Sequence, residues 1–141
     1  MSLFTKILNK EIPGHIVWED EHAFAILTIA PNADGHTLVI PRQEIDHWID
    51  VPTELTHHLI DVSQKIASTL QNVYSPVKVG VMIAGLEVRH VHYHLIPINA
   101  LTELIPGNEI KNYTADRLAD QASRIRTALQ NAGHGEFVPK I

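Results

Sequence analysis

The stretch Arg89-His-Val-His-Tyr-His-Leu-Ile-Pro97 is the most informative part of this 141-residue chain. Its three histidines, His90, His92 and His94, alternate with apolar or aromatic residues. Because alternate side chains of a β-strand point to the same face, the pattern predicts a strand with three imidazoles on one face and a core-facing row on the other. Such a face favours chemistry over packing, since one neutral ring nitrogen can attack phosphorus while a neighbouring ring handles a proton.

Helical spacing of apolar residues predicts the helices of the chain. A long amphipathic helix is expected over residues 53–73, with its apolar stripe at Leu55, Leu59, Val62, Ile66 and Leu70. A short first helix begins after Ser2, a residue type that caps helix N-termini, and a late helix begins in the same way after Thr114. Gly133 ends that late helix.

Short apolar runs predict strands near residues 16–19, 23–28, 37–40, 77–83 and 90–98. The expected fold class is α+β, an antiparallel sheet of about five strands with the long helix packed on one face. We expect residues 1–141 to form a single domain, in which residues 101–141 are a linker followed by the C-terminal helix and a tail.

Composition narrows the classes of function. A formal net charge of −5, with 11 basic against 16 acidic residues, argues against a surface that binds extended nucleic acid. The absence of cysteine excludes disulfides and cysteine-ligated zinc. No apolar run approaches the roughly 20 residues of a membrane span, and the first residues lack the layout of a secretory signal. We therefore expect a cytoplasmic protein that needs no membrane. As a separate expectation, the protein works without a cofactor.

Three further segments accompany the histidine run: Leu3–Pro13, Trp18–Asp20 and Gly35–Pro41. Together with His-x-His-x-His they resemble the histidine triad (HIT) family of small nucleotide-binding domains. The resemblance implies a HIT-like fold and a hydrolase or nucleotidyl transferase that acts through a covalent nucleotidyl-histidine. It implies a small-molecule nucleotide substrate, such as a nucleoside phosphoramidate, a dinucleoside polyphosphate or a related conjugate.

The same resemblance implies roles for four histidines. His92 is the nucleophile that attacks an α-phosphate, His94 and His90 assist it, and His36 is the fourth histidine of the site. The residues alone do not select His92 over its neighbours, because its central position only gives it access to both flanking rings. Relatives that join their sheets as two-fold dimers further imply a homodimer. The C-terminal helix either contacts that partner or covers the core of its own chain.

The sequence departs from the family pattern just before the triad. It reads Gly85-Leu-Glu87 where many relatives have Gly-Gln-Ser or Gly-Gln-Thr, and the loop leading to the triad is shortened. Three interpretations of Glu87 stay open. Its carboxylate repels a bound phosphate, it orients a triad imidazole, or it faces water.

A second departure concerns the nucleoside. Thr28 stands, by its spacing from His36, where relatives place an acidic or amide residue for the ribose hydroxyls. Its hydroxyl cannot bind two hydroxyls in the bidentate way of a carboxylate. Leu27 and Ile29 are candidates for the apolar wall against the base, although strand alternation makes some residues of this strand plain core.

Two alternatives to an enzyme are open at this stage. His90, His92 and His94 with His36 offer nitrogen ligands for zinc, but neighbouring same-face positions on a strand lie about 7 Å apart, which is too far for three of them to share one ion comfortably. The second alternative is a nucleotide-binding or interaction module that has lost efficient turnover through the shortened loop and Glu87.

Overall fold

The computed structural model describes residues 1–140, so Ile141, the last residue of the predicted tail, lies outside the described residues. One antiparallel sheet has the strand order β1-β2-β3-β5-β4. Its strands are β1 (Ile16–Glu19), β2 (Ala23–Leu27), β3 (Thr37–Pro41), β4 (Lys78–Met82) and β5 (Tyr93–Ile98). The predicted α+β class and the five-stranded antiparallel sheet are confirmed.

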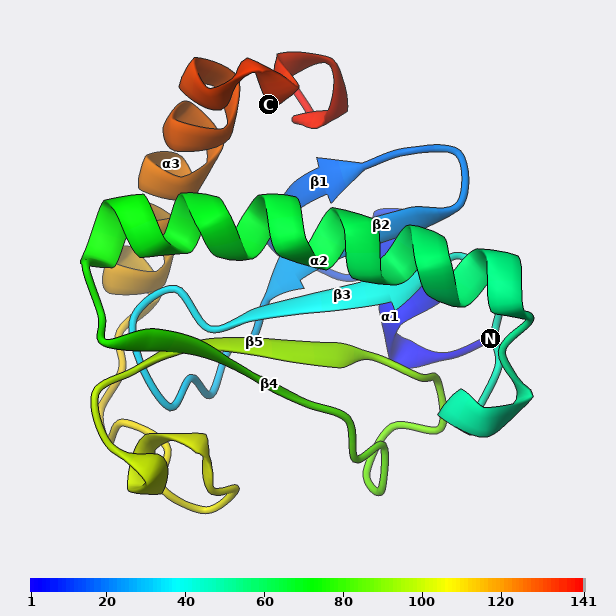
Figure 1. The fold of residues 1–141 in the computed structure, drawn as a ribbon, viewed down its shortest axis with the longest axis horizontal. Coiled ribbons are helices and arrows are strands. Elements are labelled where there is room, and N and C mark those ends of the chain that lie inside the picture. Colours follow the sequence, from blue (N-terminus) through cyan, green and yellow to red (C-terminus); the bar gives the residue numbers. More distant parts are fainter. Residues whose placement is uncertain (141) are drawn as a thin grey trace.

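Three α-helices accompany the sheet in the described part of the chain: α1 (Leu3–Leu8), α2 (Thr53–Tyr74) and α3 (Ala115–Leu129). Short helical turns lie at Trp48–Asp50, Leu101–Leu104, Gln130–His134 and Gly135–Phe137. Figure 1 shows α2 lying across the sheet, with α3 beside the C-terminal end of α2 and β4 at the sheet edge.

The two faces of the sheet bury different sets of side chains. On the face that α2 and α3 cover, the strands contribute Val17, Ala23, Ala25, Leu27, Val39, Tyr93 and Leu95. The opposite face buries a smaller cluster of Phe4, Ile16, Phe24, Ile26, Leu38 and Ile40. Alternation along β2 and β5 sends neighbouring residues to opposite faces. The triad histidines alternate with core residues, so they belong to the face opposite α2.

The apolar stripes of the helices are buried within this chain. Leu59, Val62, Ile66 and Leu70 of α2 are fully buried, as the predicted spacing requires. The stripe of α3 packs into the same core as α2, through Leu118, Ala122, Ile125 and Leu129. Of the two expectations for the C-terminal helix, the structure therefore supports the one in which its stripe covers the core of its own chain.

The strand that carries the histidines starts later than the sequence predicts. The expected strand began at His90, but β5 begins at Tyr93, where its pairing with Val39 of β3 starts. Before that point the chain follows a different neighbour, because the backbone N–H of Val91 donates to the carbonyl of Ile45, beyond the end of β3. His90 and His92 therefore lie just outside the ladder.

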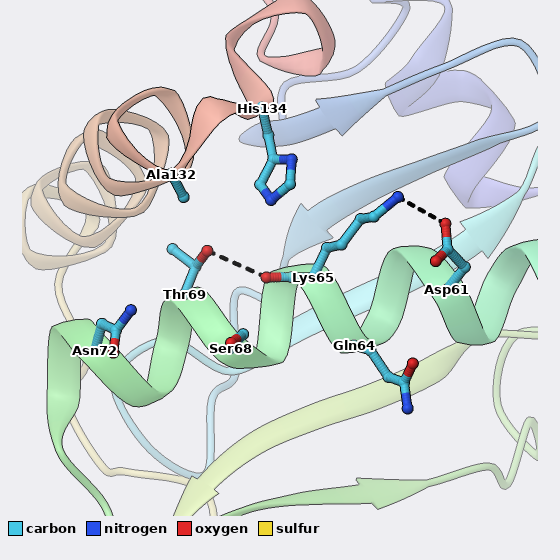
Figure 2. A pocket seen from close by; sticks show the side chains of 8 residues that line it. All are labelled: Asp61, Gln64, Lys65, Ser68, Thr69, Asn72, Ala132 and His134. Carbon is cyan, nitrogen blue, oxygen red and sulfur yellow. Dashed lines mark hydrogen bonds and ion pairs between the residues drawn. The ribbon is translucent and has the colours of Figure 1, made fainter.

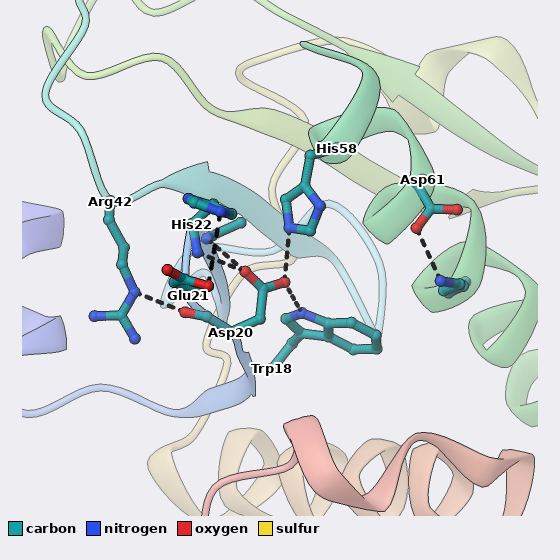
Figure 3. Close-up of polar contacts among 9 residues, drawn as sticks. Trp18, Asp20, Glu21, His22, Arg42, His58 and Asp61 are labelled. Atoms are coloured by element: carbon teal, nitrogen blue, oxygen red, sulfur yellow. Dashed lines mark hydrogen bonds and ion pairs between the residues drawn. The ribbon is translucent and has the colours of Figure 1, made fainter. Parts of the chain in front are cut away.

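Asp20 ties α2 to the turn between β1 and β2. Its carboxylate accepts from Trp18 Nε1 at 2.8 Å and lies 2.9 Å from His58 Nε2 of α2, as Figure 3 shows. It also accepts the backbone N–H groups of His22 and Ala23. Burial alone would raise the pKa of Asp20, but these hydrogen bonds outweigh it and hold the pKa below its ordinary value. His58 thus has a defined contact that joins α2 to the turn between β1 and β2.

Within residues 1–140, none of the helices combines the length and the hydropathy that a membrane crossing requires.

Candidate functional site

Four histidines gather on the sheet face opposite α2. His94 lies on β5 opposite Leu38 of β3, and His36 directly precedes β3. The ring centroids of His92 and His94 are 4.9 Å apart, and those of His36 and His94 are 5.1 Å apart. The structure therefore places the fourth histidine, which is distant in sequence, beside the triad.

Both ring nitrogens of His90 are occupied. The Nε2 lies 2.7 Å from the carbonyl oxygen of Pro41, and because a carbonyl can only accept, Nε2 carries the proton. The Nδ1 lies 2.6 Å from the hydroxyl of Ser2. The residue is fully buried, and burial lowers the pKa of His90 below its ordinary value. A neutral His90 with both nitrogens engaged is unavailable as a nucleophile.

His92 is arranged differently. Its Nδ1 lies 2.8 Å from the backbone carbonyl of His90, so Nδ1 carries the proton and the neutral ring keeps its lone pair on Nε2. The ring of Phe4 packs edge-on against this ring, with the two ring centroids 4.8 Å apart. Burial lowers the pKa of His92, which keeps the ring neutral near pH 7. A neutral Nε2 with a free lone pair is what a nucleophile requires.

His36 and His94 form a hydrogen-bond relay, that is, a chain of hydrogen bonds from the backbone N–H of Asn32 through His36 to His94. The backbone N–H of Asn32 determines which nitrogen donates at each step. The N–H of Asn32 donates to His36 Nδ1 at 3.1 Å, so a neutral His36 carries its proton on Nε2. That nitrogen lies 2.8 Å from His94 Nδ1, which must accept, and a neutral His94 then carries its proton on Nε2. Burial, followed by the neighbouring His94, lowers the pKa of His36 to about 3, and burial lowers the pKa of His94 to about 4.

These contacts therefore give the neighbouring rings of His92 and His94 different protonated nitrogens. His92 presents a lone pair on Nε2, while His94 beside it presents an N–H on Nε2 that can donate to a phosphoryl oxygen or to a leaving group. A nucleophile next to a hydrogen-bond donor suits group transfer at phosphorus. The sequence alone could not make this distinction, because it depends on the partner of each Nδ1.

Protein stability should fall in mild acid because of this site. Between the ordinary histidine pKa of 6.5 and the lowered values of about 3 and 4, the unfolded chain binds more protons at His36 and His94 than the folded chain does. The free energy of unfolding therefore decreases as pH falls from 6.5, by about 1.4 kcal/mol per pH unit for each such histidine at most. Urea unfolding at pH 7, 6 and 5 measures this slope.

A matched pair of variants assigns that slope to the site. His36→Gln removes one of the two depressed groups, so we expect it to flatten the decrease in stability between pH 6 and pH 5. His57→Gln replaces an exposed histidine of α2 and should keep the slope of the original protein. Equal slopes in all three proteins would contradict the prediction.

The candidate nucleoside residues lie at different depths. The backbone N–H of Thr28 donates to the carbonyl of His36 at 3.4 Å, which places Thr28 beside the histidines. Its hydroxyl accepts from the N–H of Ala30. Ile29 is 82% exposed, whereas Leu27 is buried in the core beneath α2 and α3, on the sheet face away from the histidines. Of the proposed apolar wall, Leu27 is therefore core.

The loop before the triad holds the remaining candidates. Gly85 adopts a φ of +74°, in the left-handed region, and Glu87 is exposed. The hydrogen-bond partners of the site imidazoles are Ser2, Asn32, Pro41, the backbone of His90 and one another. Of the three interpretations of Glu87, its placement is that of a residue facing water.

Sequence reasoning missed three residues that contact the histidines. Ser2 caps α1 and Phe4 lies in its first turn, and their contacts with His90 and His92 join parts of the chain almost ninety positions apart. A single sequence carries no signal for such pairs. Asn32 is closer to His36 and lies in a turn-rich segment, which is the one local signal that could have been used.

A groove of about 350 Å³ lies elsewhere, between α2 and the C-terminal turns, as Figure 2 shows. Lys65 and His134 border it, and Lys65 pairs with Asp61 at 2.8 Å. None of the four site histidines lines this groove. Across residues 1–140, no group of three or more His, Cys, Asp or Glu side chains is placed to hold a metal ion.

Comparison with known proteins agrees with this arrangement. The model of the HIT domain matches residues 9–101. An uncharacterised HIT-like protein of Methanocaldococcus jannaschii is 36% identical over 123 residues, covering 84% of this chain and 95% of that protein. The adenosine 5'-monophosphoramidase of Saccharomyces cerevisiae is 34% identical over 96 residues, covering 67% of this chain and 61% of the yeast protein.

A solved structure supports the same assignment. The crystal structure of a HIT-like protein involved in cell-cycle regulation from Bartonella henselae superposes with a TM-score of 0.75 at 32% identity, covering 91% of this chain and 96% of that one. The five-stranded sheet, the paired histidine rings and these matches together define an α+β domain of the HIT type. The chain belongs to the histidine triad (HIT) family.

Proposed function

We propose that this protein hydrolyses nucleoside phosphoramidates, dinucleoside polyphosphates or related nucleotide conjugates through a covalent nucleotidyl-His92. The observation that carries the proposal is the hydrogen bond from His92 Nδ1 to the carbonyl of His90, which leaves Nε2 as an unprotonated nucleophile beside His94. The adenosine phosphoramidase activity in the name of the yeast relative supports the substrate class.

The proposed reaction has two steps. His92 Nε2 attacks the α-phosphorus, a new P–N bond forms, and the bond from phosphorus to the leaving group breaks. The leaving amine or phosphate departs, the amine taking a proton from solvent, while His94 Nε2–H donates a hydrogen bond to the developing negative charge. Water then attacks the same phosphorus and the P–N bond to His92 breaks. The electron pair returns to Nε2, a proton passes to solvent, and a nucleoside monophosphate is released.

Intact-protein mass spectrometry tests this proposal. The protein is mixed with a fluorogenic adenosine phosphoramidate or with a dinucleoside polyphosphate, and both the product and the protein mass are followed after rapid acid quenching. We expect released product together with a transient mass increase equal to one nucleotidyl group. Nucleotide binding without product and without adduct would reject the hydrolase and favour a binding module instead.

We also propose that the protein acts in the cytoplasm as a homodimer joined through β4. This strand ends the sheet and pairs on one side with β5, which leaves its other edge open. Val81 on this strand is 52% exposed. An open edge with an exposed β-branched residue is suited to pairing with the same strand of a second copy, which joins two sheets into one.

A charge at this edge should weaken the dimer. We expect Val81→Lys to raise the dimer dissociation constant about tenfold or more, because two symmetry-related lysines would approach one another. Light scattering coupled to size exclusion over a dilution series measures the constant. Ile49→Lys is the control, since Ile49 is also exposed but lies outside β4. Dissociation by Ile49→Lys alone would place the interface elsewhere.

A further inference from the structure

The hydroxyl of Ser2 contacts two residues, Thr5 and His90, and lies 3.3 Å from the hydroxyl of Thr5. It accepts from the backbone N–H of Thr5 at 3.1 Å, which caps α1. It also lies 2.6 Å from Nδ1 of His90. Because Nε2 of His90 donates to the carbonyl of Pro41, Nδ1 of the neutral ring is an acceptor, and the Ser2 hydroxyl is its donor. Ser2 thus completes the hydrogen bonding of a fully buried imidazole.

Glu44 holds Ser2 in this place. Its carboxylate accepts from the backbone N–H of Ser2 and from the hydroxyl of Thr5, the latter at 2.7 Å. These two hydrogen bonds lower the pKa of Glu44 to about 2. The carboxylate therefore stays ionised near neutral pH, and its hydrogen bonds connect the start of α1 to the segment after β3.

We propose that Ser2 is a positioning residue, which fixes the ring of His90 and, through the carbonyl of His90, aims His92 at its substrate. The inference rests on the proposed function of His92. Its physical basis is that a buried acceptor left without a donor is destabilising, so the imidazole of His90 would shift to regain a partner. Such a shift moves the carbonyl that holds His92 Nδ1–H, and small misplacements of a nucleophile reduce rates strongly.

Two substitutions at Ser2 separate positioning from helix capping. Ser2→Gly removes the hydroxyl, but glycine is among the residue types that a helix N-cap tolerates best. Ser2→Thr keeps a hydroxyl. We expect kcat to fall about tenfold or more in Ser2→Gly with KM nearly unchanged, because no substrate contact is lost, and to recover in Ser2→Thr. Thr114→Gly is the control, since Thr114 caps α3 in the same way and should leave kcat unchanged.

Nitrogen NMR of labelled histidine gives a readout that needs no turnover. In the original protein we expect His90 to be the Nε2–H tautomer and His92 the Nδ1–H tautomer. In Ser2→Gly, the Nδ1 resonance of His90 should move toward that of a nitrogen without a protein donor, and the resonances of His92 should move with it. Unchanged His90 and His92 resonances in Ser2→Gly would overturn the inference, whatever the kinetics show. If the original protein has no turnover, the proposed function fails while this experiment still decides the role of Ser2.

Discussion

The His92→Ala variant should lose turnover on nucleoside phosphoramidates by about 10⁴-fold or more, the range that follows removal of a covalent nucleophile. Among the four histidines, His92 combines a neutral ring, a proton fixed on Nδ1 and a lone pair on Nε2. His90 has both nitrogens engaged, and Nε2 of His94 carries the proton in the relay from His36. Steady-state kinetics together with the nucleotidyl adduct measure the effect.

Two comparisons make that result specific. His57→Ala removes an exposed histidine of α2 and should leave turnover unchanged. In His92→Gly, added imidazole should restore part of the product release, because a free ring can occupy the space beneath Phe4 and attack phosphorus itself. Circular dichroism must show that each variant is folded. Turnover by folded His92→Ala close to that of the original protein would refute His92 as the nucleophile.

The sequence alone predicted local structure well because local structure depends on local periodicity. The stripe of α2 and the cap at Thr114 are read from residues three or four positions apart, and both agree with the structure. The alternation of His92 and His94 with Tyr93 likewise predicts which residues share a face. The start of β5 was wrong because it depends on Ile45, which lies far away in sequence.

The chemistry of the site was harder to predict for the same reason. The residue types at positions 90, 92 and 94 are identical, so the roles of the three imidazoles differ only through their partners. Those partners are the backbone of His90, the ring of His36 and the hydroxyl of Ser2, and two of them come from distant segments. Periodicity carries no information about which atom of a ring is protonated. The middle position of His92 in the triad favours it as the nucleophile only weakly. The hydrogen bond at its Nδ1 is the physical reason for which we propose that role.

Gly35→Ala should be the most destabilising small substitution near the site, at about 2–5 kcal/mol. Gly35 has a φ of +88°, which costs an alanine about 1–2 kcal/mol. A Cβ there would lie 2.3 Å from Cε2 of Tyr74, and overpacking adds about 1–3 kcal/mol. The ring of Tyr74 cannot move away freely, because its hydroxyl donates to Gln121 at 2.6 Å. Urea unfolding measures the loss.

Gly133→Ala separates the two causes. Gly133 has a φ of +91°, but a Cβ there would meet no atom within 4 Å, so its cost should be the backbone term alone. The excess in Gly35→Ala is then the collision with Tyr74. Since Gly35 directly precedes His36, relief of that collision should displace the relay to His94 and lower kcat, whereas Gly133→Ala should leave kcat unchanged. If the two variants lost equal stability, the collision would contribute nothing and Gly35 would matter only for its backbone conformation.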